Sequence, residues 1–389
     1  MKTRLLRIRK CALAAAALVV GGLACGTAFA ASTLPWYVNP ARKAQVSVGA
    51  ASFESPTLRL SADGGWLGFA AASDGAGRVA AFRMADLAAL DAADAVADDA
   101  GVSGSAADLG LGEGRPHVLA SGTLGAAVAW RADGTAAAAL PNGALTYRRW
   151  TKRFSPARAA VPAGAGALAL NAAGDRAWSA APDGRLVAWA VSGNAADGSL
   201  AFAQTDVAWE TGLSSVADVA VYALGGSDAA LVCGGREVAL VGLADGAKRT
   251  LLSGLSADAV AARLSHADTW RPRLYVLTAD GALAVHVFAA DEQAIDGKWT
   301  KTLAAADLCA LAGWAEGTKA AAFDVSADGT TLVLAPAGGS ALAVVRHEPK
   351  VWCYWKDDAD GLQYVSDGNW KLRCWDEWGN VAIGTGWET

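Results

Sequence analysis

Short apolar runs of five to eight residues alternate with polar, glycine-containing turns along most of the chain. Runs of this length are typical of β-strands, because helices in globular proteins are usually longer. The turns contain Asp-Gly, Asn-Gly or Gly-Gly, and these residues adopt the positive φ angles of tight hairpins at little cost. The pattern therefore predicts a chain built from β-hairpins.

The hairpins recur as a repeat with two parts. In the first part, a strand-like run, a polar turn and a second run occur six times, at 57–71, 127–140, 167–181, 219–233, 261–277 and 321–335. In the second part, a glycine turn opens a further strand, at 74–82, 142–150, 183–191, 234–242, 280–288 and 338–346. In the last five copies this turn glycine is Gly143, Gly184, Gly235, Gly281 and Gly339. Each copy thus predicts three consecutive strands.

A fourth strand follows in most copies. The candidate segments are 116–120, 152–157, 200–208, 248–252 and 298–303. The sixth copy has no such segment before the tail, and we expect Ala44–Val48 to supply it. Pairing of that kind joins the first and last copies and leaves no long exposed edge.

The SADG and DGxLxVx hairpins resemble those of WD40-like and YVTN-like β-propellers over about residues 44–346. The resemblance implies an all-β fold, a β-propeller of about six or seven four-stranded blades. The intervals between the turn glycines agree with the ~40–50 residues of one blade plus insertions. Two alternatives are another all-β sandwich and an alanine-rich helical repeat, since alanine favours helices. The frequent turn glycines argue against helices of useful length.

The composition changes after Pro349. Residues 351–389 contain six tryptophans and two alanines, and short runs at 351–355, 362–365, 370–375 and 380–383 predict a small β-meander. A disulfide between Cys353 and Cys374 would join its first and third strands, and so small a unit needs such a link for stability. The tryptophans form the core of this unit and dock it on the propeller, form a candidate ligand face, or dock a partner. They are Trp352, Trp355, Trp370, Trp375, Trp378 and Trp387.

The end of the tail, GNWKLRCWDEWGNVAIGTGW, resembles a choline-binding repeat. The matching residues are Gly368, Trp370, Gly379, Thr385, Gly386 and Trp387. The resemblance covers one repeat. It implies a surface that binds cations or sugar rings, which stack on exposed tryptophan faces.

Residues 1–30 have the layout of a secretory signal peptide. A basic start is followed by an apolar run at 11–27 and by Ala28-Phe29-Ala30, a typical cleavage site. A membrane anchor and a lipoprotein attached through Cys25 are the alternatives. Cleavage would remove five basic residues and change the formal charge from −5 to −10, leaving 28 basic and 38 acidic residues. We therefore expect an exported protein without a membrane span in its mature part. We expect no nucleic-acid partner, because that affinity depends on neutralising phosphates.

The domain organisation that we expect is a signal peptide at 1–30, a propeller at 31–349 and a disulfide-linked, tryptophan-rich unit at 350–389. An insertion at 84–114 interrupts the propeller. Residues 84–100 predict a short acidic helix or a loop, and 101–114, with five glycines, predict a loop.

Candidate chemistry is sparse. The chain has four histidines and no HExxH, GxSxG or phosphate-binding glycine loop, so the sequence predicts no catalytic residue, no metal ligand and no cofactor. Asp218, Arg263 and Asp324 are the charged residues nearest to the predicted inner strands, and a dispersed central site would use them. His286 lies within a strand pattern and is expected in the core. Cys233 and Cys309 either pair, as export permits, or remain buried thiols.

These observations favour a monomeric, exported binding protein without enzymatic activity, whose propeller is a platform for a protein or glycan partner. The step from fold to function is an analogy, since one fold hosts many functions. A propeller hydrolase, lactonase or lyase with a dispersed central site is one alternative. Attachment to the cell envelope through the tryptophan-rich tail is the other.

Overall fold

The structure is a computed structural model, and it describes eighteen segments of the chain. They are residues 42–47, 54–73, 76–84, 102–105, 117–119, 127–130, 136–140, 143–148, 153–156, 167–181, 183–193, 201–265, 272–289, 293–339, 341–346, 351–357, 370–376 and 381–385. The predicted signal peptide and most of the acidic segment at 84–100 lie outside these residues.

Six of the seven sheets follow the repeat of the sequence and are numbered here as blades 1 to 6. Blade 1 contains β2 (Glu54–Leu60), β3 (Trp66–Ser73), β4 (Ala76–Arg83) and β6 (His117–Leu119). Blade 2 contains β7 (Ala127–Trp130), β8 (Ala136–Leu140), β9 (Gly143–Arg148) and β10 (Arg153–Pro156). Blade 3 contains β11 (Leu168–Leu170), β12 (Arg176–Ala180), β13 (Arg185–Ser192) and β14 (Ala201–Glu210).

The second half of the ring has the same construction. Blade 4 contains β15 (Asp218–Leu224), β16 (Ser227–Gly234), β17 (Glu237–Gly242) and β18 (Lys248–Ser253). Blade 5 contains β19 (Ala259–Ser265), β20 (Arg273–Thr278), β21 (Leu283–Phe288) and β22 (Ile295–Leu303). Blade 6 contains β23 (Ala320–Val325), β24 (Thr331–Pro336), β25 (Ala341–Arg346), β1 (Arg42–Ser47) and β5 (Val102–Ser105).

The first strands of the blades form a closed ring. Around the ring, β2 contacts β7, β7 contacts β11, and β11 contacts β15. The ring continues from β15 to β19 and β23, and β23 contacts β2 again. All pairings within blades 1 to 5 are antiparallel, as the hairpin repeat predicts. They join strands that follow one another along the chain, except that β4 pairs with β6 while β5, between them in the chain, belongs to blade 6. The chain is therefore a β-propeller, and the described strands make six blades.

Blade 6 is completed by the strand nearest to the N-terminus. β1 pairs antiparallel with β25, with Ala44 opposite Val344, and this confirms the strand expected at 44–48. The loop expected at 101–114 is wrong for Val102–Ser105, because β5 pairs in parallel with the outer edge of β1. Pairing satisfies backbone groups that the edge of β1 would otherwise leave open, and this tertiary gain overrides a glycine-rich composition.

The recurring SADG turn has a common hydrogen-bond pattern. In the turn between β2 and β3, the Ser61 hydroxyl donates to Asp63 at 2.5 Å, and the Trp66 N–H donates to Ser61 Oγ at 2.9 Å. In the turn between β23 and β24, Ser326 and Asp328 repeat both contacts at the same distances, with Thr331 as the backbone donor. The serine and aspartate therefore close the turn, which explains why these residues recur.

Apolar layers between neighbouring blades form the core. One layer between blades 1 and 6 contains Leu58, Phe69 and Leu342, and comparable layers separate blades 3 and 4, blades 4 and 5, and blades 5 and 6. The helix α3 (Ala305–Ala312) follows β22 and buries Leu308 and Leu311 in the last of these layers. The hairpin pattern does not predict this helix.

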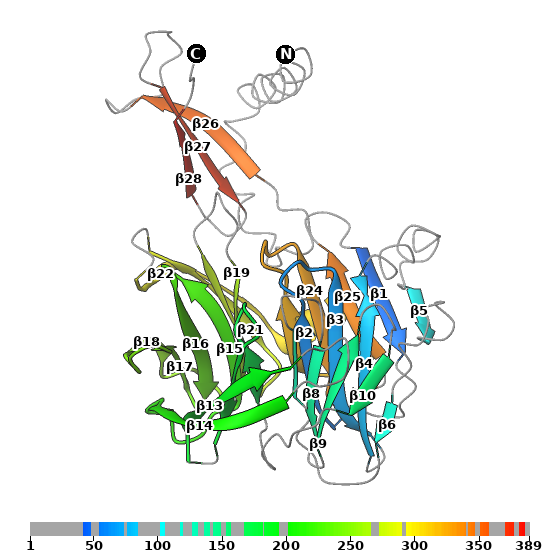
Figure 1. Cartoon of the computed structure of the whole chain (residues 1–389). Helices are drawn as coiled ribbons and strands as arrows, with labels where there is room; N and C mark the ends of the chain where they lie inside the picture. Colours follow the sequence, from blue (N-terminus) through cyan, green and yellow to red (C-terminus); the bar gives the residue numbers. More distant parts are fainter. Residues whose placement is uncertain are drawn as a thin grey trace, which may run out of the picture.

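The tail forms a separate sheet of three strands (Figure 1). These are β26 (Val351–Asp357), β27 (Trp370–Asp376) and β28 (Val381–Thr385), all paired antiparallel in chain order. The strand predicted at 362–365 lies outside the described residues. In the described part of the chain, no helix has the length and apolar character needed to cross a membrane.

Candidate functional site

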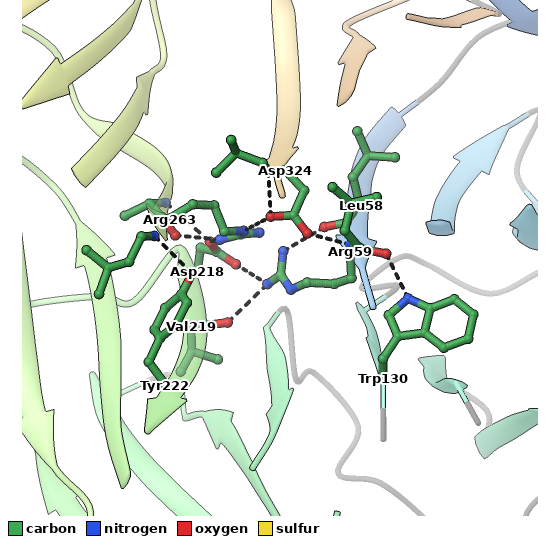
Figure 2. Close-up of polar contacts among 12 residues, drawn as sticks. Leu58, Arg59, Trp130, Asp218, Val219, Tyr222, Arg263 and Asp324 are labelled. Atoms are coloured by element: carbon green, nitrogen blue, oxygen red, sulfur yellow. Dashed lines mark hydrogen bonds and ion pairs between the residues drawn. The ribbon is translucent and has the colours of Figure 1, made fainter. Parts of the chain in front are cut away.

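Four charged residues meet at the centre of the propeller (Figure 2). They are Arg59 on β2, Asp218 on β15, Arg263 on β19 and Asp324 on β23, and we call them the central ion network. Each belongs to the inner strand of a different blade, namely 1, 4, 5 and 6. All four are buried, with 3% to 8% of the residue surface exposed.

The apolar neighbours in each strand explain the position of these charges. Leu58, Val219, Leu264 and Phe323 each adjoin one charged residue and pack in a layer between blades. Successive residues of a strand lie on opposite faces of its sheet. Packing of the apolar residue therefore directs the adjacent charged residue away from that layer.

Arg59 links blade 1 to blade 4. Its Nη2 donates to Asp218 Oδ1 at 2.5 Å and to the Val219 carbonyl at 3.0 Å. Its Nη1 donates to the carbonyl of Leu58 at 2.8 Å. Blade 2 is attached to the same residue, because Trp130 Nε1 donates to the Arg59 carbonyl at 2.7 Å.

Arg263 bridges both carboxylates. Its Nε donates to Asp324 Oδ1 at 2.9 Å, and its Nη1 donates to Asp218 Oδ2 and, at 2.6 Å, to the Ala262 carbonyl. Its guanidinium carbon lies 5.7 Å from the centroid of the Phe323 ring, a distance suited to a cation–π interaction.

Backbone N–H groups complete the solvation of the carboxylates. Leu60 donates to Asp324 Oδ2 at 2.5 Å, and Val325 donates to Asp324 Oδ1 at 2.9 Å. Ala262 donates to Asp218 Oδ2 at 3.4 Å. Each of the four carboxylate oxygens therefore accepts at least one hydrogen bond, which is what a buried carboxylate needs.

The network contains two arginines and two aspartates, and burial sets the direction of the pKa shift of both aspartates. Burial raises the pKa of Asp218, and the nearby Arg59 opposes this effect. Burial also raises the pKa of Asp324 to about 6, against the influence of Arg59 and of the Leu60 and Val325 N–H groups. Burial lowers the pKa of Arg59, but Asp218 and Asp324 outweigh it, so the net shift is upward. Arg59 therefore remains cationic.

This arrangement limits what the network does chemically. The two arginines place positive charge beside both carboxylates, which disfavours binding of a cation between them. Among the described residues, no group of three or more histidine, cysteine, aspartate or glutamate side chains is suited to hold a metal ion. The geometry is that of a charge-compensated link between blades.

The sequence pointed to three of the four network residues. Asp218, Arg263 and Asp324 were expected near the inner strands, and the structure brings them together. Arg59 was missed. The sequence contains a feature that could have identified it. Arg59 stands between Leu58 and Leu60 in a predicted inner strand, where a charged residue needs buried partners.

His286 and two cysteines are buried in the blades. His286 Nδ1 lies 3.1 Å from Thr300 Oγ1, its Nε2 has no hydrogen-bond partner, and burial lowers its pKa to about 4. The core position expected for His286 is confirmed, with 8% of its surface exposed. Cys233 and Cys309 are buried free thiols and do not pair. Burial raises the pKa of the Cys233 thiol.

In the tail, the register places Cys353 opposite Cys374. Directly opposed residues of antiparallel strands have Cα atoms about 4.5 to 5.5 Å apart. A disulfide accepts about 4.4 to 6.8 Å. The predicted disulfide is thus compatible with the backbone. Four tryptophans of the candidate ligand face lie on β26 and β27, and Trp378 and Trp387 lie outside the described residues.

No family model matches the chain, and no curated protein matches its sequence. Among solved structures, the chain is similar to the structure of U3-55K, with a TM-score of 0.46, 11% identity, and coverage of 78% of this chain and 98% of that chain. It is also similar to the crystal structure of the RRP9 WD40 repeats, with a TM-score of 0.45, 11% identity, and coverage of 79% and 98%. The assignment as a propeller rests on the ring of six sheets itself.

Proposed function

We propose that this protein is an exported, non-enzymatic binding protein whose propeller is a platform for a protein or glycan partner. The observation that carries the proposal is the central ion network. Its arginines and aspartates bind one another across blades 1, 4, 5 and 6. Their charges serve to join the blades, which suits a scaffold better than acid–base chemistry.

Export is proposed from residues 1–30, with cleavage after Ala30. Expression of the full chain in a bacterial host, followed by fractionation and mass measurement of the intact product, tests this step. We expect a product that begins at Ala31 outside the cytoplasm. A product that retains residues 1–30 in the cytoplasm would contradict export. We also propose a monomer, because β1 and β5 cover the outer edge of blade 6.

An enzyme assay with matched variants tests the scaffold against the hydrolase alternative. Three purified proteins comprising residues 31–389 are tested on a panel of esters, lactones and glycosides. They are the wild type, the variant Asp324→Asn in the central ion network, and the variant Asp183→Asn at the exposed partner of Arg185. We expect no turnover above buffer for all three proteins. Turnover that Asp324→Asn abolishes and Asp183→Asn retains would make a propeller hydrolase the better assignment.

A binding assay tests the platform directly. The same three proteins are applied to a glycan array and to isolated cell-envelope fractions at 0.15 M salt. We expect saturable binding, equal in wild type and both variants at a temperature where all are folded, because the network is buried. Failure to bind any glycan or envelope fraction, together with turnover in the enzyme assay, would overturn the proposal.

A further inference from the structure

Two tryptophans from neighbouring blades meet at one end of the ring. Trp66 is the first residue of β3 in blade 1, and Trp130 is the last residue of β7 in blade 2. Their ring centroids lie 6.2 Å apart, and the ring planes are inclined by 45°. Both residues are partly exposed, whereas Trp178 and Trp189 of blade 3 are buried. We call Trp66 and Trp130 the tryptophan pair.

Hydrogen bonds hold both residues of the pair in place. Trp130 Nε1 donates to the Arg59 carbonyl at 2.7 Å, and Figure 2 shows the indole nitrogen turned toward that carbonyl. The Trp66 N–H donates to Ser61 Oγ at 2.9 Å, and the Trp66 carbonyl accepts from the Ser61 N–H at 2.9 Å. Residues that are fixed before a ligand arrives lose less conformational entropy when it binds.

The repeat does not require aromatic residues at these two positions. Where β7 ends at Trp130, the first strands of the other blades end at Leu60, Leu170, Leu224, Ser265 and Val325. Where β3 begins at Trp66, the second strands of the other blades begin at Ala136, Arg176, Ser227, Arg273 and Thr331. Tryptophan combines an apolar ring with a polar N–H group and is enriched at binding surfaces. The pair is therefore a departure from the repeat that favours binding over folding as its purpose.

The turn before Trp66 leaves the surface next to the pair uncovered. A Cβ atom added at Gly64 would meet nothing within 4 Å, and one added at Gly65 would meet only the carboxylate of Asp63. Gly64 has a φ of +64° and needs to be glycine, but Gly65 is not among the glycines with positive φ. Blade 6 has Thr330 at the same place in its turn. The bare position at Gly65 thus does not follow from the backbone, and it keeps the approach to Trp66 open.

Asp63 places a carboxylate in this turn. The residue is exposed, and its Oδ1 accepts from the Ser61 hydroxyl at 2.5 Å and from the Gly65 N–H at 3.0 Å. Ser61 Oγ contacts both Asp63 and the Trp66 N–H, so the carboxylate lies close to the pair. A carboxylate has about four acceptor positions, so it can also accept hydrogen bonds from hydroxyl groups of a ligand. Its charge repels an anionic ligand.

We propose that the tryptophan pair and Asp63 bind a neutral glycan. A sugar ring packs its C–H face on an indole ring, and its hydroxyl groups donate to Asp63. Aromatic rings with centroids about 4.5–7 Å apart contact each other, so the pair does not enclose a cation between its rings. Charged residues are depleted at the centre of protein interfaces, so Asp63 favours a glycan over a protein. This inference rests on the proposed function and names the site and the glycan class.

The test measures binding of residues 31–389 to neutral and charged glycans by affinity electrophoresis. The neutral probes are laminarin, xylan and galactomannan, and the charged probes are polygalacturonate and glycol chitosan. The main variant combines Trp66→Thr with Trp130→Leu, because threonine and leucine stand at these positions in blades 6 and 1. The matched control is Trp209→Leu. Trp209 lies on β14 and is also partly exposed, and its Nε1 donates to the Leu243 carbonyl at 3.3 Å.

We expect binding to at least one neutral glycan. The double variant should bind about tenfold more weakly or worse, whereas Trp209→Leu should bind within about twofold of wild type. Trp66→Phe should retain more binding than Trp66→Thr, because a phenyl ring still stacks on a sugar. The thermal unfolding midpoint of each variant shows whether the propeller remains folded.

A second measurement on the wild type does not depend on the folding of any variant. Tryptophans are oxidised with N-bromosuccinimide in the presence and absence of the glycan that binds, and mass spectrometry locates the modified residues. The glycan should slow oxidation of Trp66 and Trp130 and leave that of Trp209 unchanged.

Four outcomes would overturn the proposal. They are absence of binding to all three neutral glycans, unchanged binding by the folded double variant, unchanged oxidation of Trp66 and Trp130, and tighter binding to polygalacturonate or glycol chitosan. If a glycan, an envelope fraction or a protein binds wild type and the double variant equally, the platform function stands and this site fails. Absence of any binding together with turnover in the enzyme assay would instead remove the proposed function itself.

Discussion

Arg59 illustrates how much one buried residue contributes when its partners come from distant parts of the chain. It donates to Asp218, 159 residues away, and its carbonyl accepts from Trp130. Loss of Arg59 leaves two aspartates beside a single arginine in a buried site. An uncompensated buried charge costs more than the intact network contributes, so the effect of a substitution depends on the charge that remains.

Arg59→Met should therefore destabilise the protein by about 3–5 kcal/mol, as for other broken buried pairs. The double variant Arg59→Met with Asp218→Asn restores neutrality and should recover part of this loss. Urea unfolding measures both free energies. Arg185→Met, at an exposed pair with Asp183, is the control and should change stability by less than about 0.5 kcal/mol. Equal losses in the single and double variants would contradict the charge argument.

His286 and Asp324 make the free energy of unfolding depend on pH in opposite directions. The folded pKa of His286 is about 4, below the ordinary value of 6.5, so the unfolded chain binds the proton more readily. Its contribution to stability is present above about pH 6.5 and is lost as the pH falls toward 4. The folded pKa of Asp324 is about 6, above its ordinary 3.8, so its contribution is present at low pH and is lost as the pH rises toward 6.

His286→Gln should isolate the histidine effect. The difference in unfolding free energy between wild type and this variant should fall by about 3 kcal/mol from pH 7 to pH 4, since one pKa unit corresponds to about 1.4 kcal/mol. Urea titrations at several pH values give this difference, and subtraction removes the contribution of Asp324. A difference that stays constant over this range would show that His286 is not buried in its neutral form.

At the scale of elements, the hairpin is the unit that local sequence specifies. The SADG turns, the strand lengths and the antiparallel order of each blade follow from residues within a single copy of the repeat. β5 is an exception, because the strands β2, β3 and β4 of another blade lie between it and its partner β1 along the chain. The tail sheet is another hairpin unit, and its register places Cys353 opposite Cys374.

We expect a disulfide between Cys353 and Cys374 when residues 31–389 are produced in an oxidising compartment. Alkylation of the folded, non-reduced protein should leave all four mature cysteines unmodified, because Cys233 and Cys309 are buried. Unfolding alone should expose two thiols, and unfolding with a reductant should expose four. Mass spectrometry counts the modified groups. Four reactive thiols in the unfolded, non-reduced protein would exclude the disulfide.

At the scale of the whole molecule, the stability of the propeller depends on closure of the ring between blade 6 and blade 1. The N-terminal segment joins the last blade to the first through two contacts. β1 pairs with β25 and completes blade 6, and β2 of blade 1 contacts β23 of blade 6. The central ion network adds a third connection, because Arg59 of blade 1 binds residues of blade 4 and its neighbour Leu60 binds Asp324 of blade 6. Stability of the propeller therefore depends on a segment outside the repeat.

Removal of residues 31–48 should lower the thermal midpoint by roughly 10 °C or more, because β25 loses its partner along six residue pairs. Removal of residues 350–389 should leave the midpoint of the propeller within about 2 °C of the intact chain, since the tail forms its own sheet. Calorimetry on both truncated proteins tests this contrast. Equal destabilisation by the two deletions would contradict closure through β1.

The sequence by itself determined the strand composition, the hairpin order, the six copies and the strand that closes the ring. These features depend on local patterning and on short-range turn chemistry, which leave a periodic signature. Tertiary structure alone decided that Arg59 joins Asp218, Arg263 and Asp324, that α3 fills a layer between blades 5 and 6, and that β5 extends blade 6. Such partners are brought together by closure of the ring, and the spacing of residues along the chain carries no record of which side chains will face one another across its centre.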